Sequence, residues 1–216
     1  DALGRDEGAT LHMTLLAGFA AVLGAWSGQS SFGIGTPVAN RTHPAQMEAL
    51  GLFVSTLALR VRLGPEERPF ADLATRLAAD MTAALAHQDL PFDRLLGALG
   101  VPREAGRPPL TPVLFILQNA GDLDGFAAPE LAVERVPVDT GTAKFELTLS
   151  LEDEADGALA GVLEFAADLF LPATVERLAE GYARLLHGVA AMPATSLREL
   201  LAASGLDRAA GVRVVE

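Results

Sequence analysis

Apolar residues recur every three or four positions in three long stretches of the chain, which is the spacing of an amphipathic helix. These stretches cover residues 11–26, 70–86 and 172–192, and Thr10 is a suitable N-cap for the first of them. Pro91 stands where a first helical position is expected and opens a short run, PFDRLLGAL. The segment TSLRELLAASG predicts one more short helix.

Other stretches follow strand patterns. FGIGTPVANR (32–41) indicates a short buried strand that runs into a turn-rich loop, and VLFILQN (113–119) is typical of a strand buried on both faces. LAVERVPV (131–138) predicts a modest strand. KFELTLSLE and LAGVLEF flank Asp156-Gly157, a strong turn signal, and predict a β-hairpin. From Thr56 onward the chain alternates, which places one apolar set on one face of a strand: Leu57, Leu59, Val61 and Leu63.

Together these elements predict a mixed α/β domain in which long helices pack on one side of a sheet. Half of the 216 residues are hydrophobic, which suits a domain with a sizeable core. The formal net charge of −12 argues against nucleic acid or an anionic membrane as a partner. The chain has no cysteine, which fits a cytoplasmic location, and its most apolar stretch is shorter than the roughly 20 residues that a bilayer needs.

The sequence contains few motifs that by themselves indicate a catalytic or ligand-binding site. The GIG at residues 33–35 lacks the third glycine of a dinucleotide-binding loop, because position 38 is Val. The chain has no G-x-S-x-G or H-E-x-x-H motif. The four histidines are scattered and none has a neighbour at ligand spacing, so no metal site is expected.

His87-Gln88-Asp89 is the densest polar cluster. It could be a general base oriented by a carboxylate, but adjacent residues point to different faces of a regular element. The favoured interpretation is structural: Asp89 caps the helix that starts near Pro91, and His87 ends the helix before it.

Two other polar groups leave alternatives open. Arg103, Glu104 and Arg107 could bind an anion or form a loop salt bridge. Gln118-Asn119 end an apolar strand and are either hydrogen-bonded to neighbouring backbone or line a channel.

Several stretches, taken in order, resemble the condensation domains of nonribosomal peptide synthetases. They are GTPVANR (35–41), LGLFVSTLALR (50–60), HQDLPFD (87–93), REAGRPPL (103–110), VLFILQN (113–119), AKFELTLSLE (143–152) and LEFAADLFLPATVERL (163–178). The family usually has Asn at Ser55, Glu at Asp93 and Asp at Glu104, and each exchange keeps polarity or charge.

The resemblance implies a chloramphenicol-acetyltransferase-like fold of two α/β subdomains with a tunnel between them. In that family, acyl donor and aminoacyl acceptor arrive on the phosphopantetheine arms of two carrier proteins, and no cofactor is bound directly. The family's catalytic signature, His-His-x-x-x-Asp-Gly, lies in the N-terminal subdomain, and this chain has no adjacent His pair.

We therefore expect residues 1–192 to be the C-terminal subdomain, inactive alone, and residues 193–216 a linker toward a downstream adenylation domain. The expected partners are the N-terminal subdomain and the upstream and downstream carrier proteins. No catalytic residue is carried over to this chain. Residues assigned tentatively to the tunnel wall are Gly51, Ser55, Thr56, Gln118 and Asn119; residues of family motifs with an expected structural role are His87, Gln88, Asp89, Pro91, Phe92, Asp93, Arg103 and Arg107.

Three other interpretations remain open. The chain could be a heterocyclization or epimerization relative of the same superfamily, or a non-catalytic docking module that keeps the fold. An independent acyl-binding protein would instead need a closed apolar pocket within this chain.

Overall fold

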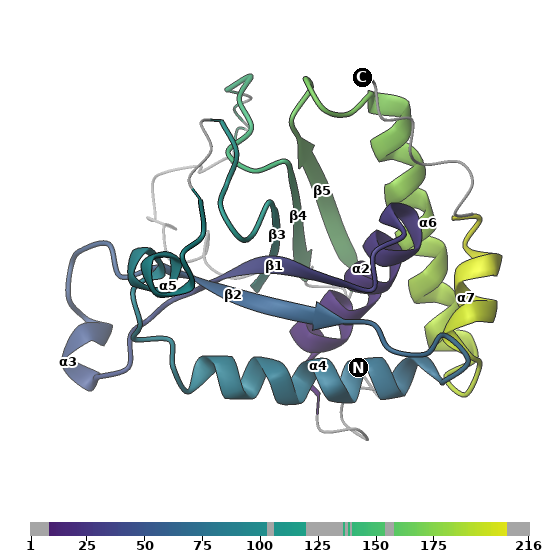
Figure 1. Cartoon of the computed structure of the whole chain (residues 1–216), viewed down its shortest axis with the longest axis horizontal. Helices are drawn as coiled ribbons and strands as arrows, with labels where there is room; N and C mark the ends of the chain where they lie inside the picture. The colour runs from purple at the N-terminus through teal and green to yellow at the C-terminus, as the bar shows by residue number, and fades with distance from the viewer. Residues whose placement is uncertain are drawn as a thin grey trace, which may run out of the picture.

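Three long helices and five strands form the body of the protein in a computed structural model that describes residues 9–102, 106–119, 136, 138, 140–153 and 158–206. The helices α2 (Leu11–Ser27), α4 (Phe70–Leu85) and α6 (Pro172–Ala191) confirm the three predicted from apolar spacing (Figure 1). Thr10 caps α2 as predicted, because its side chain accepts a hydrogen bond from the backbone N–H of Met13. The short helices are α3 (Pro44–Met47), α5 (Phe92–Leu99) and α7 (Leu197–Ala203).

The five strands form one mixed sheet in the order β2-β1-β3-β4-β5. The central strands β1 (Ser31–Val38), β3 (Val113–Asn119) and β4 (Leu147–Asp153) run parallel, and the edge strands β2 (Ser55–Arg62) and β5 (Leu159–Phe165) run antiparallel to their neighbours. The β4–β5 pairing confirms the predicted hairpin, although its Asp156-Gly157 turn lies outside the described residues. Most of the strand expected over 131–138 also lies outside them, and Val136 and Val138, which are described, are exposed and not in a strand.

One face of the sheet, here called the inner face, is covered by α2, α4 and α6. The alternating residues Leu57, Leu59 and Val61 of β2 are buried on it, as predicted, in one cluster with residues of the three helices. At its centre the ring of Phe19 lies 6.0 Å from that of Phe115 and 5.9 Å from that of Tyr182. The long helices therefore pack on one side of the sheet.

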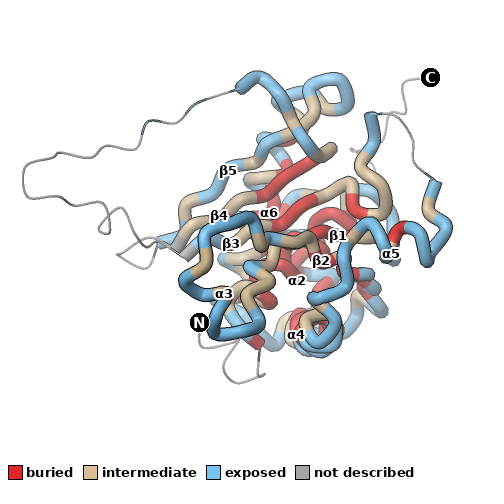
Figure 2. Tube along the Cα trace, turned by 90° about the vertical axis from the view of Figure 1, so that its left-hand side faces the viewer, coloured by how far each residue is buried: buried red, intermediate tan, exposed pale blue. Residues whose placement is uncertain are grey.

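The opposite face, here called the outer face, is covered only in part. Figures 1 and 2 both place α5 on the side of β2 opposite α2. Among the β3 residues whose burial the structure describes, Leu114 and Phe115 are buried and Gln118 is exposed. The expectation that this strand is buried on both faces holds for the neighbours Leu114 and Phe115, which lie on opposite faces, and was wrong at Gln118.

The C-terminal helix α7 belongs to the packed body. Leu197, Leu200 and Leu201 are buried in the main core, and the backbone N–H of Leu197 donates to the carbonyl oxygen of Arg68. This helix falls within the segment that we expected to be linker. Packed structure therefore extends at least to Leu206, which also contacts the core, and only residues 207–216 lie beyond the described part.

Candidate functional site

The residues assigned to the tunnel wall all lie at one end of the sheet, because of the directions in which their strands run. Because β1, β3 and β4 are parallel and β2 is antiparallel to β1, the carboxyl ends of the first three strands meet the start of β2. Ser55 pairs with Val38, and Asn119 pairs with Asp153. Gly51 lies in the loop just before β2. The carboxyl ends of parallel strands are a common place for ligand sites in α/β folds.

At this end the outer face carries two of the polar residues assigned to the tunnel wall. Thr56 and Gln118 alternate with the inner-face residues Leu57 and Leu117, so both occupy outer-face positions. Thr56 is half-buried and Gln118 is exposed. Gly35 lies on β1 between their strands, and a Cβ there would come within 3.2 Å of the Thr56 methyl group. Other outer-face positions are mixed in size: Ala58, Ser150 and Ala160 are small, whereas Leu114, Ile116 and Val162 are large and apolar.

A proline-rich segment, residues 107–112, crosses the other end of the outer face. Leu110 has a φ of 67°, which is rare for a bulky residue, and its carbonyl oxygen would lie 2.3 Å from a Cβ at Gly33. The glycine at position 33 thus permits a close approach of backbone, and this explains the GIG sequence without a nucleotide.

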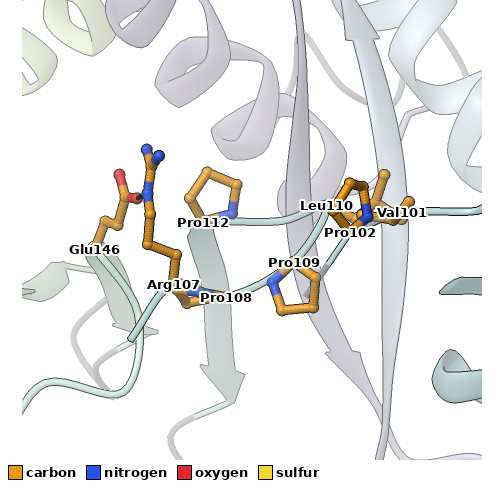
Figure 3. A pocket seen from close by; sticks show the side chains of 8 residues that line it. All are labelled: Val101, Pro102, Arg107, Pro108, Pro109, Leu110, Pro112 and Glu146. Atoms are coloured by element: carbon orange, nitrogen blue, oxygen red, sulfur yellow. Dashed lines mark hydrogen bonds and ion pairs between the residues drawn. The ribbon is translucent and has the colours of Figure 1, made fainter. Parts of the chain in front are cut away.

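The same segment lines a solvent-open pocket of about 220 Å³ (Figure 3). Figure 3 shows the side chains of Arg107 and Glu146 turned toward each other, and Arg107 Nε lies 3.2 Å from Glu146 Oε1. Of the two interpretations of the arginine cluster, the salt bridge therefore holds for Arg107, whereas Arg103 and Glu104 lie outside the described residues. The ion pair and the opening to solvent are unlike the closed apolar pocket of an acyl-binding protein.

The His87-Gln88-Asp89 cluster lies in the turn between α4 and α5. His87 follows the end of α4, as expected, and its side chain is exposed. The predicted cap by Asp89 was wrong: α5 begins at Phe92, Pro91 is its N-cap rather than its first residue, and no described side chain accepts a hydrogen bond at that cap. Within the described residues, no hydrogen bond or ion pair joins His87 to Asp89. The geometry therefore does not show His87 as a general base that is oriented by Asp89.

His12 is the histidine that the fold encloses. Its Nε2 lies 3.1 Å from the hydroxyl of Thr36 on the inner face, and its ring meets that of Phe115 edge-on at 5.1 Å. Burial lowers the pKa of His12 below its ordinary value. Since Thr36 shares the inner face with Ile34 and Leu57, His12 points away from the outer face and has a structural role.

The sequence interpretation missed Arg41 at the same end of the sheet. Its guanidinium carbon lies 4.3 Å from the centre of the Phe53 ring, and its Nη1 donates to the carbonyl oxygens of Gln46 and Ala49. The available signal was its place at the end of GTPVANR, directly before a loop with several apolar residues.

Comparison with known proteins shows the family. A family model described as "Condensation domain" matches residues 2–210, nearly the whole chain. The chain belongs to the condensation domain family. It is 41% identical over 201 residues to the phosphinothricin tripeptide synthetase PhsC of Streptomyces viridochromogenes, covering 92% of this chain and 18% of that protein. It is 37% identical over 210 residues to tyrocidine synthase 3 of Brevibacillus parabrevis, covering 95% of this chain and 3% of that protein.

The fold agrees with this assignment. The condensation domain from the monacolin K polyketide synthase MokA superposes with a TM-score of 0.81 at 21% identity, covering 91% of this chain and 45% of that one. The chain thus spans less than half of that condensation-domain structure and a small part of the curated synthetases that it matches. Among the described helices none is both long enough and apolar enough to cross a membrane.

Proposed function

We propose that this chain is the C-terminal half of a peptide-bond-forming condensation domain in a nonribosomal peptide synthetase. The observation that carries the proposal is the coverage: 91% of this chain matches a condensation domain, but only 45% of that domain is accounted for. The exposed end of the outer face is a surface on which the other half would pack. This chain would then provide one wall of the tunnel, including Thr56 and Gln118.

In the proposed reaction the amine nitrogen of the acceptor bonds to the thioester carbonyl carbon of the donor. The carbon–sulfur bond breaks, and the thiol takes up the proton that the amine loses. A neutral amine already attacks a thioester, so alignment is the main contribution required. Alignment of two bound reactants can lower a barrier by about 7–11 kcal/mol at best. The role of this chain would be to orient the two substrates.

The phosphopantetheine arms that would deliver the substrates would contact the outer face at its polar positions. Thr56 and Gln118 offer polar groups that can hydrogen-bond to the amides of such an arm. The arm would supply the thioester and its thiol leaving group. The carrier proteins, and an adenylation domain downstream, are the further partners of this proposal.

The test joins this chain to the polypeptide encoded directly upstream of Asp1 and supplies donor and acceptor carriers, each loaded with its aminoacyl group. We expect the downstream carrier to gain the donor acyl group in an amide, detected by mass spectrometry of the intact carrier. The chain without the upstream polypeptide should give no product. Peptide formation by the chain alone, or its absence with the joined protein, would contradict the proposal.

The same assay separates the rival functions. A heterocyclization relative would give a product that has lost one further water. An epimerization relative would leave the mass of the loaded carrier unchanged and invert a stereocentre, and a docking module would do neither.

A further inference from the structure

The pocket beside the proline-rich segment has rigid and largely apolar walls. It measures about 220 Å³ and opens to solvent. Six of its eight lining residues are apolar, and four of the six are proline. The six are Val101, Pro102, Pro108, Pro109, Leu110 and Pro112. Figure 3 shows Arg107 and Glu146 on the opposite side of the pocket from Val101 and Pro102. Because proline fixes φ, these walls keep their shape before anything binds.

One wall of the pocket is held in a strained turn. The backbone N–H of Thr111 donates to the carbonyl oxygen of Pro109 at 2.7 Å, across Leu110, whose φ is 67°. A hydrogen bond between residues two apart around a positive φ makes a γ-turn of the rare, strained kind. The carbonyl oxygen of Leu110 also lies so close to Gly33 that a Cβ there would come within 2.3 Å of it. Strained backbone persists only where neighbouring contacts hold it, and it occurs preferentially at ligand sites.

The backbone of the walls offers a ligand few hydrogen-bonding groups. A proline has no backbone N–H to donate. The carbonyl oxygens of Pro109 and Pro112 already accept from the backbone N–H groups of Thr111 and Glu146. Polar recognition in the pocket therefore falls mainly to two side chains, those of Arg107 and Glu146.

The ion pair between these two side chains can exchange partners at little cost. Arg107 Nε lies 3.2 Å from Glu146 Oε1, and the side chains are 66% and 20% exposed. Ion pairs that water reaches contribute little to stability, because water screens them and holding two long side chains costs entropy. A guanidinium has five N–H donors, which is enough for more than one acceptor. A ligand with a carboxylate for Arg107 and an ammonium for Glu146 would replace the pair charge for charge.

Charge and size both point to a small zwitterion. The pocket has one positive and one negative side chain, so it is locally neutral, although the whole chain has a net charge of −12. A neutral zwitterion keeps this balance, whereas a ligand with a net charge would bind one side chain and displace the other. The volume equals roughly seven water molecules at about 30 Å³ each, which is too little for a drug-sized ligand.

We propose that this pocket binds a free α-amino acid with an apolar side chain. The ammonium of the ligand lies at Glu146, its carboxylate at Arg107, and its side chain against the prolines. The proposal goes beyond the proposed function and does not depend on it, because a free amino acid carries no thioester. Pro112 and Glu146 directly precede β3 and β4, so the pocket lies at the opposite end of the sheet from Gln118.

The experiment is a chemical-shift titration of the isotope-labelled chain. The backbone amides of Leu110, Thr111 and Glu146 report both affinity and location. L-leucine carries an apolar body and both charges; glycine lacks the apolar body, N-acetyl-L-leucine lacks the ammonium, and L-leucinamide lacks the carboxylate. We expect L-leucine to bind at least tenfold more tightly than each of the other three, because only L-leucine meets all the groups that line the pocket.

Two variants assign the charges to their side chains. Glu146→Gln should abolish the preference for L-leucine over N-acetyl-L-leucine, and Arg107→Gln should abolish the preference for L-leucine over L-leucinamide. A purely structural defect would instead weaken all four ligands alike. The matched control is Glu180→Gln in α6, which breaks another exposed ion pair of 3.2 Å, with Arg184, on the inner-face side of the sheet. That variant should bind all four ligands as the wild type does.

The comparison of the four ligands on the wild-type chain decides the proposal even where a variant fails to fold. L-leucine that leaves the three amides unshifted, or glycine that binds as tightly as L-leucine, would overturn it. L-leucinamide binding as tightly as L-leucine would reveal a cation site, and N-acetyl-L-leucine doing so an anion site; either result would overturn the choice of a zwitterion. None of these measurements involves peptide formation, so failure of the proposed function would leave them unchanged.

Discussion

Replacing Gly33 with alanine tests whether the proline-rich segment is locked onto the sheet. Gly33 does not have a positive φ, so alanine suits its backbone, and the conflict is one of space alone. The new Cβ would lie 2.3 Å from the carbonyl oxygen of Leu110, whereas real Cβ atoms essentially never come within 3.0 Å of a non-bonded heavy atom from elsewhere in the chain. The obstacle is backbone rather than a flexible side-chain end, so β1 and the segment must move apart.

Overpacking of this kind costs about 1–3 kcal/mol, which is a measurable part of the 5–15 kcal/mol typical of a domain. With a urea dependence of about 1–3 kcal/mol per molar, the unfolding midpoint should fall by roughly 1 M. The matched control is Gly97→Ala in α5, where a Cβ meets nothing within 4 Å. That variant should gain about 0.5–1 kcal/mol, because alanine is the better helix former. Circular dichroism during urea titration measures both, and a Gly33→Ala protein as stable as the wild type would refute the close approach.

Three further predictions use the same titration. Tyr182→Phe should cost about 1 kcal/mol, because the buried hydroxyl donates to the carbonyl oxygen of Leu15 at 3.0 Å; an unchanged midpoint would mean that this bond contributes nothing. Because burial lowers the folded-state pKa of His12, the unfolded chain takes up a proton more readily, so stability should fall as the pH drops below about 6.5. His12→Asn should flatten that slope, and an equal slope in both proteins would contradict it. Leu200→Ala should cost about 2–5 kcal/mol and Arg198→Ala, which removes an exposed ion pair, less than 1 kcal/mol; the reverse order would show that charge rather than apolar burial holds α7.

The sequence by itself predicted the elements whose signal is local. The spacing of apolar residues in 11–26, 70–86 and 172–192 determines α2, α4 and α6, and the Thr10 cap follows from a side chain acting within one turn. Alternation from Thr56 onward determined which face of β2 is buried. The two limbs of the β4–β5 hairpin were equally clear, because pairing between adjacent segments needs only a turn.

Local signals failed where a neighbour distant in sequence decides the outcome. Asp89 has the chemistry of a cap, but α5 begins too late for it to act. VLFIL is uniformly apolar and the two residues after it are polar; Gln118 is exposed on the outer face, so burial on both faces does not extend to the carboxyl end of the strand. The helix predicted from TSLRELLAASG is confirmed as α7, but only the tertiary structure shows that Leu197 and Leu200 pack in the main core.

For the candidate site, the sequence identified the motifs that contribute residues but not their arrangement in space. Residues 51–56 and 118–119 are far apart in the chain, and no periodicity relates them. They lie at the same end of the sheet because β1 pairs in parallel with β3 and antiparallel with β2, while the inner face of the sheet packs against three helices. Sequence thus determined which segments are helix or strand, since those preferences act over a few residues. Tertiary structure alone decided which strand ends share a surface, and how Arg41 shapes the loop beside it, because both depend on contacts that local sequence does not encode.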